Sequence, residues 1–164
     1  MQDAPAQALR LDPDHAAFVQ GGVSVVVSSR NDQLVADVLR GCGCRVSRNR
    51  RKVTVLVERE RAGTVVDDIR ANGHIAVVFS QPSTHRTLQL KGTDATVARA
   101  TPADLRTSRG HLEAWMADMQ KLGYEGAFTR AVRGEGSDLL AISFTVAAAF
   151  EQTPGPAAGR RLAD

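Results

Sequence analysis

The 164-residue chain has few cysteines, few aromatic residues and hardly any lysine. Two cysteines are too few for a disulfide framework, and no run of about 18 apolar residues could span a bilayer. The start, MQDAPAQALRLDPD, has acids where a secretory signal needs a basic and then an apolar stretch. We therefore expect a cytoplasmic protein with no membrane segment.

The remaining composition is that of an ordinary globular domain. Hydrophobic residues make up 43% and charged residues 24% of the chain, and the length suits a single domain. The net charge of +3 is too small to indicate nucleic acid by itself. Among the 21 basic residues only Lys52, Lys91 and Lys121 are lysines, and arginine binds planar anions in a bidentate way that lysine cannot.

The hydrophobic pattern predicts a mainly β protein with helices. The strands are expected at residues 23–28, 34–46, 52–58, 74–80, 84–91, 95–98 and within the apolar run 139–150. This is about six strands in successive runs rather than strict βαβ alternation. Such an order favours an antiparallel sheet or a small barrel over a parallel doubly wound sheet.

Helix start and stop signals separate these strands. Asp12-Pro13 opens a short helix that Gly21-Gly22 ends, and Asn72-Gly73 ends a helix beginning at Arg61. Thr101-Pro102-Ala103-Asp104 opens a long helix up to Gly123, and residues 125–133 add further helix. We expect one domain over 1–164, with a loose arm at 1–11 and an irregular tail at 151–164.

The cysteines and histidines do not indicate a metal site. Cys42 and Cys44 are two residues apart on a predicted strand, so their side chains should share a face. A structural zinc site needs four ligands, and no second cysteine pair or suitably spaced histidine exists. Two buried core thiols are the preferred interpretation. His111 is expected to be partly exposed and inert, and Trp115 to belong to the helix core.

Arg45, Arg48, Arg50, Arg51 and Lys52 form a dense basic stretch. Phosphate or nucleic-acid contact is one interpretation, and a solvated hairpin tip is the other. We favour the tip for most of the stretch, although Arg45 differs because it lies within a strand. A nucleic-acid binder also needs stacking platforms, and aromatic residues are only 4% of this chain.

The alternating segment at 84–91 has a polar side suited to a ligand. Leu88 and Leu90 face one way, and Thr87, Gln89 and Lys91 face the other, with Arg86 at the start. An amide such as that of Gln89 both donates and accepts hydrogen bonds, which suits the edge of a heteroaromatic ring. A half-solvated strand explains the pattern equally well.

The sequence resembles the pyridoxamine 5′-phosphate oxidase-like, FMN-binding split-barrel family. The resemblance rests on the order of elements and on IRANGHIAVVFSQPSTHRTLQLKGTDATV, where a helix ending in Asn-Gly feeds two strands closed by Lys-Gly. It covers residues 12–160. It implies a six-stranded antiparallel split β-barrel that forms a homodimer, with FMN bound in clefts between the two copies.

The resemblance also implies positions for the cofactor ligands. Arg40 and Arg45 match the basic residues of the family's second strand, and Arg61 and Thr64 match its phosphate ligands at a helix start. Arg86, Thr87 and Gln89 fall where the family's strand approaches the flavin ring. Helix N-termini favour anions on their own account.

The expected function is flavin-dependent oxidation or reduction of an unidentified small molecule, with no acid–base residue assigned. The oxidase's Ser-Arg-Lys motif is replaced here by Arg61-Ala62-Gly63-Thr64, so a true pyridoxamine phosphate oxidase is not expected. The alternatives are a non-catalytic binder of haem, a deazaflavin or another planar ligand, and an arginine-rich nucleic-acid binder.

Overall fold

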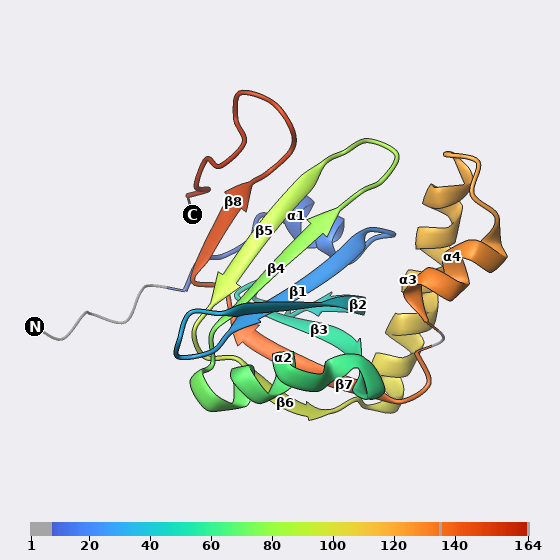
Figure 1. The fold of residues 1–164 in the computed structure, drawn as a ribbon. Helices are drawn as coiled ribbons and strands as arrows, with labels where there is room; N and C mark the ends of the chain where they lie inside the picture. Colours follow the sequence, from blue (N-terminus) through green and yellow to red (C-terminus); the bar gives the residue numbers. More distant parts are fainter. Residues whose placement is uncertain (1–7, 135, 164) are drawn as a thin grey trace, which may run out of the picture.

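The computed structural model describes residues 8–134 and 136–163 and contains one eight-stranded antiparallel sheet (Figure 1). The strand order is β6-β7-β3-β2-β1-β4-β5-β8. The strands are β1 (Ser24–Arg30), β2 (Ala36–Val46), β3 (Lys52–Glu58), β4 (Ile75–Ser80), β5 (Thr87–Gly92), β6 (Thr96–Arg99), β7 (Leu139–Thr145) and β8 (Ala148–Glu151).

Four helices accompany this sheet, namely α1 (Pro13–Val19), α2 (Arg59–Asn72), α3 (Pro102–Gln120) and α4 (Gly126–Arg133). In Figure 1, α1 lies behind β4 and β5, whereas α3 and α4 stand together beside the sheet. Both α2 and α3 contact β2. No helix in the described part of the chain is long and apolar enough to cross a bilayer.

The structure has eight strands where about six were expected. The apolar run 139–150 accounts for part of the difference, because the chain turns after Thr145 and the run forms two strands in different places in the sheet. Its first half, β7, pairs with β3 and β6, and its second half, β8, pairs with β5. An uninterrupted hydrophobic pattern does not reveal this turn, since the apolar residues continue through it and Val146 within it is buried.

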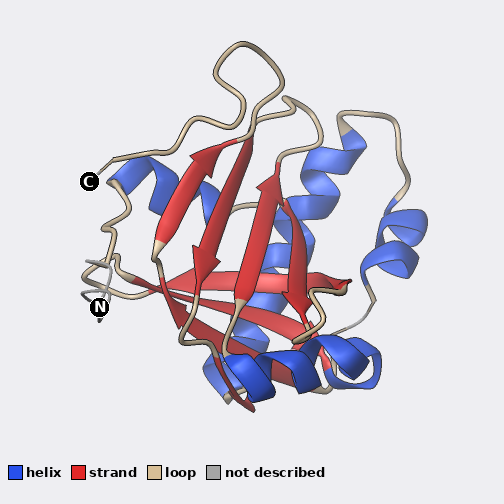
Figure 2. Cartoon of the chain, turned by 60° about the vertical axis from the view of Figure 1, so that its left-hand side comes forward, coloured by secondary structure: helices blue, strands red, loops and turns tan. Residues whose placement is uncertain are grey.

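The sheet curls so that its two groups of strands cross steeply (Figure 2). Alternate side chains of β1, β4 and β5 are buried, among them Val27, Phe79 and Leu90. Val65 and Ile69 of α2 belong to the same hydrophobic cluster. The core therefore fills the inside of the curled sheet, and the opposite face of β1, β4 and β5 remains only half-buried.

The local signals for helix ends are confirmed. The Asp12 carboxylate accepts a hydrogen bond from the His15 amide at 2.7 Å, and Thr101 and Asp104 form a capping box at the start of α3. Gly73 ends α2 with a φ of 71°, a left-handed conformation in which glycine has no steric cost.

The two cysteines do not share a face, contrary to the sequence-based expectation. The β2–β3 register shifts between Gly41 and Gly43, and this bulge turns consecutive side chains out of alternation. Cys44 belongs to the main core, whereas Cys42 packs with Leu56 in a smaller cluster under α3. Burial raises the pKa of both thiols, so they are inert core residues.

The two ends of the chain lie against the sheet where they are described. Residues 1–7 of the expected loose arm lie outside the described residues. Leu9 and Leu11 are buried, and their amides donate to the carbonyls of Val146 and Arg50. The arm is therefore anchored from Leu9 onward. Near the other end, Arg161 forms an isolated bridge with Phe150.

Candidate functional site

The sheet face that points away from the core, which we call the open face, gathers several predicted ligand residues. The register places Arg40, Val26, Val78, Gln89 and Phe150 opposite one another across β2, β1, β4, β5 and β8. Paired residues project to the same side of a sheet. Arg40 and Gln89 therefore lie in one row, with Val26 and Val78 between them and Phe150 beyond Gln89.

A second row of hydroxyl groups runs beside the first. Ser24 pairs with Ser80, and Ser80 pairs with Thr87. The Ser80 and Thr87 hydroxyls are 2.8 Å apart, and Arg40 donates from Nη1 to the Ser24 hydroxyl at 2.9 Å. Arg40, Thr87 and Gln89 are thus brought to one surface that combines apolar and hydrogen-bonding groups.

The indole of Trp115 closes this surface on the side of α3. The Arg40 guanidinium lies 5.8 Å from the centre of the Trp115 ring, which is within the range of a cation–π contact. Trp115 is only 3% exposed, and its Nε1–H has no hydrogen-bond partner among the described residues. A buried donor of this kind normally has an acceptor, and this one is enclosed by protein atoms and has none in the described part of the chain.

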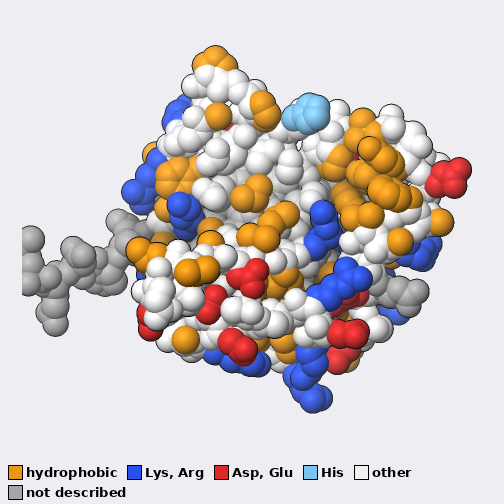
Figure 3. Space-filling view, viewed as in Figure 1, with side chains coloured by type: hydrophobic (Ala, Val, Ile, Leu, Met, Phe, Trp, Pro, Cys, Tyr) orange, Lys and Arg blue, Asp and Glu red, His pale blue; other side chains and the backbone are white. Residues whose placement is uncertain are grey.

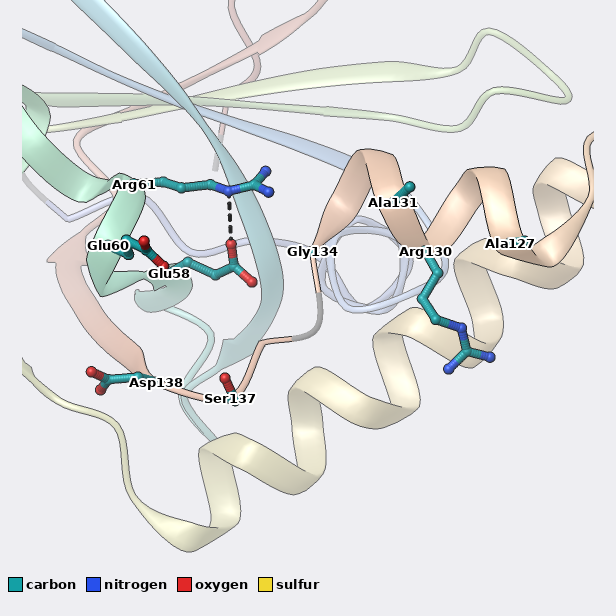
Figure 4. A pocket seen from close by; sticks show the side chains of 9 residues that line it. All are labelled: Glu58, Glu60, Arg61, Ala127, Arg130, Ala131, Gly134, Ser137 and Asp138. Carbon is teal, nitrogen blue, oxygen red and sulfur yellow. Dashed lines mark ion pairs between the residues drawn. The ribbon is translucent and has the colours of Figure 1, made fainter.

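Arg61 points into a cavity of about 570 Å³ between the β3–α2 junction and α4 (Figure 4). Its Nε atom lies 3.0 Å from the Glu58 carboxylate, which also accepts the amide of Gly136 at 3.0 Å. The Arg61 side chain is 55% exposed. Glu58 therefore orients Arg61, whose outer nitrogens have no hydrogen-bond partner among the residues that the structure describes.

Arg40 belongs to the same end of the β2–β3 pair. Gly41 is paired with Val57, so Arg40 and Glu58 are the next residues along the two antiparallel strands. Opposed residues of such strands have neighbouring side chains on one face. Arg40 and Glu58, the ion-pair partner of Arg61, therefore lie at the same end of neighbouring strands.

Thr64 begins an uninterrupted helical run at this end of the molecule. Gly63 has the non-helical angles φ 38° and ψ −133°, which divide α2 into a short first turn and the run that ends at Asn72. A Cβ atom on Gly63 would meet nothing within 4 Å, so the space before this run is open. Free N–H groups at a helix start favour an anion.

Arg45 lies away from the other predicted ligands. It lies five positions along β2 from Arg40, which corresponds to about 16 Å of strand at the usual rise per residue. Its Nε atom donates to Oδ1 of Asp104 at 2.6 Å. Burial alone would raise the pKa of Asp104, but hydrogen bonds from Thr101 and Arg45 outweigh it and lower that pKa. Arg45 thus holds the N-terminus of α3.

Arg86 is also separate from the open face. It pairs with Asp14 of α1, and its guanidinium lies 4.3 Å from the centre of the Phe18 ring. These contacts hold the β4–β5 turn against α1. Of the seven predicted ligands, the structure places Arg40, Thr87 and Gln89 on the open face and Arg61 and Thr64 at the adjoining end.

Sequence reasoning missed Ser24, Ser80, Glu58 and Trp115. Ser24 and Ser80 alternate with buried valine and phenylalanine residues, so the sequence could have predicted that their side chains point away from the core. Their pairing with each other depends on the β1–β4 register, which the sequence does not give. Trp115 is buried as expected for helix core. Its contact with Arg40 could not be read from helical spacing, since it joins residues 75 positions apart.

His111, expected to be partly exposed, is 5% exposed. It lies on the inner side of α3 together with Asp104, Ser108 and Trp115, which are spaced three or four residues apart. Its Nε2 atom lies 2.7 Å from the carbonyl oxygen of Val23. The residue is therefore a packed, hydrogen-bonded part of the α3–sheet interface.

No protein-family model and no curated protein matches the sequence. Among solved structures, the chain is similar to HupZ from Group A Streptococcus, with a TM-score of 0.55 and 13% identity over 91% of this chain and 99% of that chain. It is also similar to a candidate pyridoxamine 5′-phosphate oxidase from Lactobacillus delbrueckii, with a TM-score of 0.53 and 12% identity over 86% and 93% of the two chains. The split-barrel fold predicted from the sequence is confirmed.

Proposed function

We propose that the chain binds FMN and uses it to oxidise or reduce a small molecule. The supporting observation is that the strand registers bring Arg40, Thr87 and Gln89 to the open face, while Arg61 and Thr64 lie near the start of α2, directly after β3. The sequence resemblance assigns these positions to the cofactor, and the confirmed fold is compatible with that assignment. When bound, FMN supplies the hydride and electron chemistry.

The residues of this chain provide binding and orientation. Arg61 and the open helix start at Thr64 supply positive charge and N–H donors for a phosphate, with Arg40 at the same end. Val26 and Val78 offer a flat apolar surface to a ring system, and Thr87 and Gln89 offer hydrogen bonds to its polar edge.

FMN fits the open face better than haem does. Histidine, cysteine and methionine are the usual axial ligands of haem iron. The strands β1, β4, β5 and β8 contain none of them, and the two cysteines of β2 are buried. Absorbance of the purified protein separates the two cofactors. Flavin bands would support the proposal, whereas a Soret band would replace it by the planar-ligand alternative.

A titration with FMN and riboflavin tests the phosphate end directly. Both ligands have the same ring system, but only FMN has the phosphate. Losing one charge-assisted contact costs roughly 1.5–3 kcal/mol, so Arg40→Ala and Arg61→Ala should each weaken FMN at least about tenfold and leave riboflavin nearly unchanged. Failure of wild-type protein to bind FMN would overturn the proposal.

Arg45→Ala is the matched comparison for these variants. The sequence assigns Arg45 to the phosphate, whereas the structure pairs it with Asp104. We expect Arg45→Ala to lower stability and to change FMN affinity less than Arg40→Ala does. A loss of FMN affinity specific to Arg45→Ala would place the phosphate near the start of α3 instead.

We further propose that a second copy covers the open face. Val38 faces the same side as Ser28, its partner in β1, and it is 62% exposed. Leu34 and Val35 in the adjoining turn are 71% and 61% exposed, and apolar patches of this kind are typical of interfaces. Sedimentation should show a dimer that Val38→Lys weakens. A wild-type monomer at micromolar concentration would remove the shared cleft.

A further inference from the structure

Helix α4 buries polar residues and exposes apolar ones. Thr129 and Arg133 are 0% and 2% exposed, whereas Phe128 is 51% exposed and Ala127 and Ala131 are exposed as well. A surface helix normally has the reverse arrangement. The outward side of α4 therefore has an apolar surface that packing within the described chain does not explain.

A groove of about 470 Å³ lies between α4 and α3, and its volume is in the range of small-ligand sites. On the α3 side, the lining residues recur at helical spacing from Arg109 to Gln120. The complete lining is Arg109, Leu112, Glu113, Met116, Ala117, Gln120, Tyr124, Gly126 and Arg130. Figure 3 shows hydrophobic side chains gathered over the outer ends of α3 and α4, bordered by both basic and acidic side chains.

The apolar wall of this groove is already ordered. Tyr124 stacks on Phe128 with ring centres 5.3 Å apart and an interplanar angle of 17°. Met116 closes the floor, where its Cε atom would lie 2.8 Å from a Cβ atom at position 126. A side chain at this position would displace Met116, whereas glycine leaves it in place. The groove therefore has a flexible methionine thioether beside its aromatic residues.

The charged groups of the groove favour an anion. Arg109 and Arg130 are both exposed, and neither has a carboxylate within ion-pair distance in the described part of the chain. Glu113 is the one acidic residue among the lining side chains, so their formal sum is +1. Figure 4 shows Arg130 turned away from Glu58 and Arg61, which leaves its guanidinium on the α3 side.

We propose that this groove binds a small aromatic molecule with one anionic group. The ring would pack on Met116 and Tyr124, and a carboxylate or sulfonate would be held by Arg130 and Arg109. Arginine suits such groups because its planar fork donates two parallel hydrogen bonds. None of these residues belongs to the open face. Arg130 also lines the cavity into which Arg61 points, but Arg109, Met116 and Tyr124 line the groove alone, so the ring and one of the two arginines are outside the site proposed for FMN.

Two fluorescent probes with the same ring framework test this proposal. 8-Anilinonaphthalene-1-sulfonate has the sulfonate, and N-phenyl-1-naphthylamine lacks it. We expect the sulfonate to bind saturably at one site per chain and about tenfold more tightly than the amine. Arg130→Gln and Arg109→Gln should each weaken the sulfonate about three- to tenfold, as loss of a charge-assisted contact predicts, and leave the amine unchanged.

Arg106→Gln is the matched control, because Arg106 is an exposed arginine of α3 outside the groove lining. Gly126→Leu should abolish binding of both probes by forcing Met116 into the groove, with the fold checked by circular dichroism. Saturating FMN should leave sulfonate binding unaffected. Equal affinity for both probes, equal loss with Arg106→Gln, or displacement by FMN would each overturn the proposal.

Discussion

The Nε atom of Arg133 donates a hydrogen bond to Nδ1 of His111 across 3.3 Å in the interior between α3 and α4. Because an arginine can only donate, His111 must keep Nδ1 unprotonated and donate from Nε2 to the carbonyl of Val23. The two residues therefore fix one neutral tautomer of the imidazole. Burial and the neighbouring Arg133 charge lower the pKa of His111 to about 4, although the Val23 carbonyl opposes this shift.

We expect stability to fall as the pH is lowered from about 6.5 to 4. In the unfolded chain His111 takes up a proton near pH 6.5, whereas in the folded chain its pKa is about 4. The unfolded state therefore binds more protons in this range, and unfolding becomes easier by up to about 3 kcal/mol. Above pH 6.5 the contribution is complete, and below pH 4 it changes no further.

Urea unfolding at a series of pH values measures this effect. His111→Gln removes the titrating ring, so its stability should vary less between pH 6.5 and 4 than that of the wild type. His85→Gln is the control, because His85 is exposed in the β4–β5 turn and should leave the pH profile unchanged. Identical profiles for His111→Gln and the wild type would show that His111 is not the group responsible.

Arg133→Met should destabilise the protein by about 3 kcal/mol or more. The Arg133 Nη2 atom donates to the carbonyl of Cys42 at 2.5 Å and to the carbonyl and hydroxyl of Ser108, each at 2.6 Å. Methionine has a similar volume but no donor, so these buried acceptors would lose their partner. Thermal unfolding of Arg133→Met and Arg130→Met compares one buried and one exposed arginine of α4, and similar losses would contradict this role.

Local signals in the sequence were more informative than spacing along a strand. Asp12 and Thr101 act through residues three positions away, so their capping could be predicted from adjacent letters. Arg40 and Arg45 have a family-like spacing, but the bulge at Gly41–Gly43 and the ion pair to Asp104 separate them. That ion pair joins positions 59 apart, and no local pattern contains it.

The sides of the strands were predictable, but their neighbours were not. Alternation correctly placed Thr87 and Gln89 opposite Leu88 and Leu90. The row that joins Gln89 to Arg40 depends on three strand registers at once. These registers are set by tertiary packing of the core face. The open face could therefore be predicted residue by residue, whereas its assembly into one surface required the structure.

Asp118→Ala should detach the β4–β5 turn from α3. The Asp118 carboxylate accepts hydrogen bonds from the Gln81 amide group at 3.0 Å and from the amide and hydroxyl of Ser83 at 3.0 Å and 2.5 Å. Burial raises the pKa of this carboxyl, but the hydrogen bonds outweigh burial and lower it. Hydrogen bonds to charged groups are worth about 1.5–3 kcal/mol.

Amide hydrogen exchange locates this effect. In Asp118→Ala the Ser83 amide should exchange faster, while amides in β3 and β7 remain protected until global unfolding. Asp32→Ala provides the control, since Asp32 is an exposed acid in the β1–β2 turn. Unchanged Ser83 protection in Asp118→Ala would mean that the turn is held by other contacts.

Two glycine substitutions should change stability in opposite directions. A Cβ atom on Gly22 would lie 2.4 Å from both the carbonyl carbon and the oxygen of Ala114, so Gly22→Ala must push α3 away from the start of β1. Overpacking of this kind costs about 1–3 kcal/mol, and the upper end applies because backbone atoms cannot rotate aside.

On α3 itself, a Cβ on Gly110 would meet nothing within 4 Å. Gly110→Ala should therefore stabilise the helix by about 0.5–1 kcal/mol. Chemical denaturation measures both effects, and a Gly22→Ala variant as stable as the wild type would contradict the close approach of α3 to Gly22.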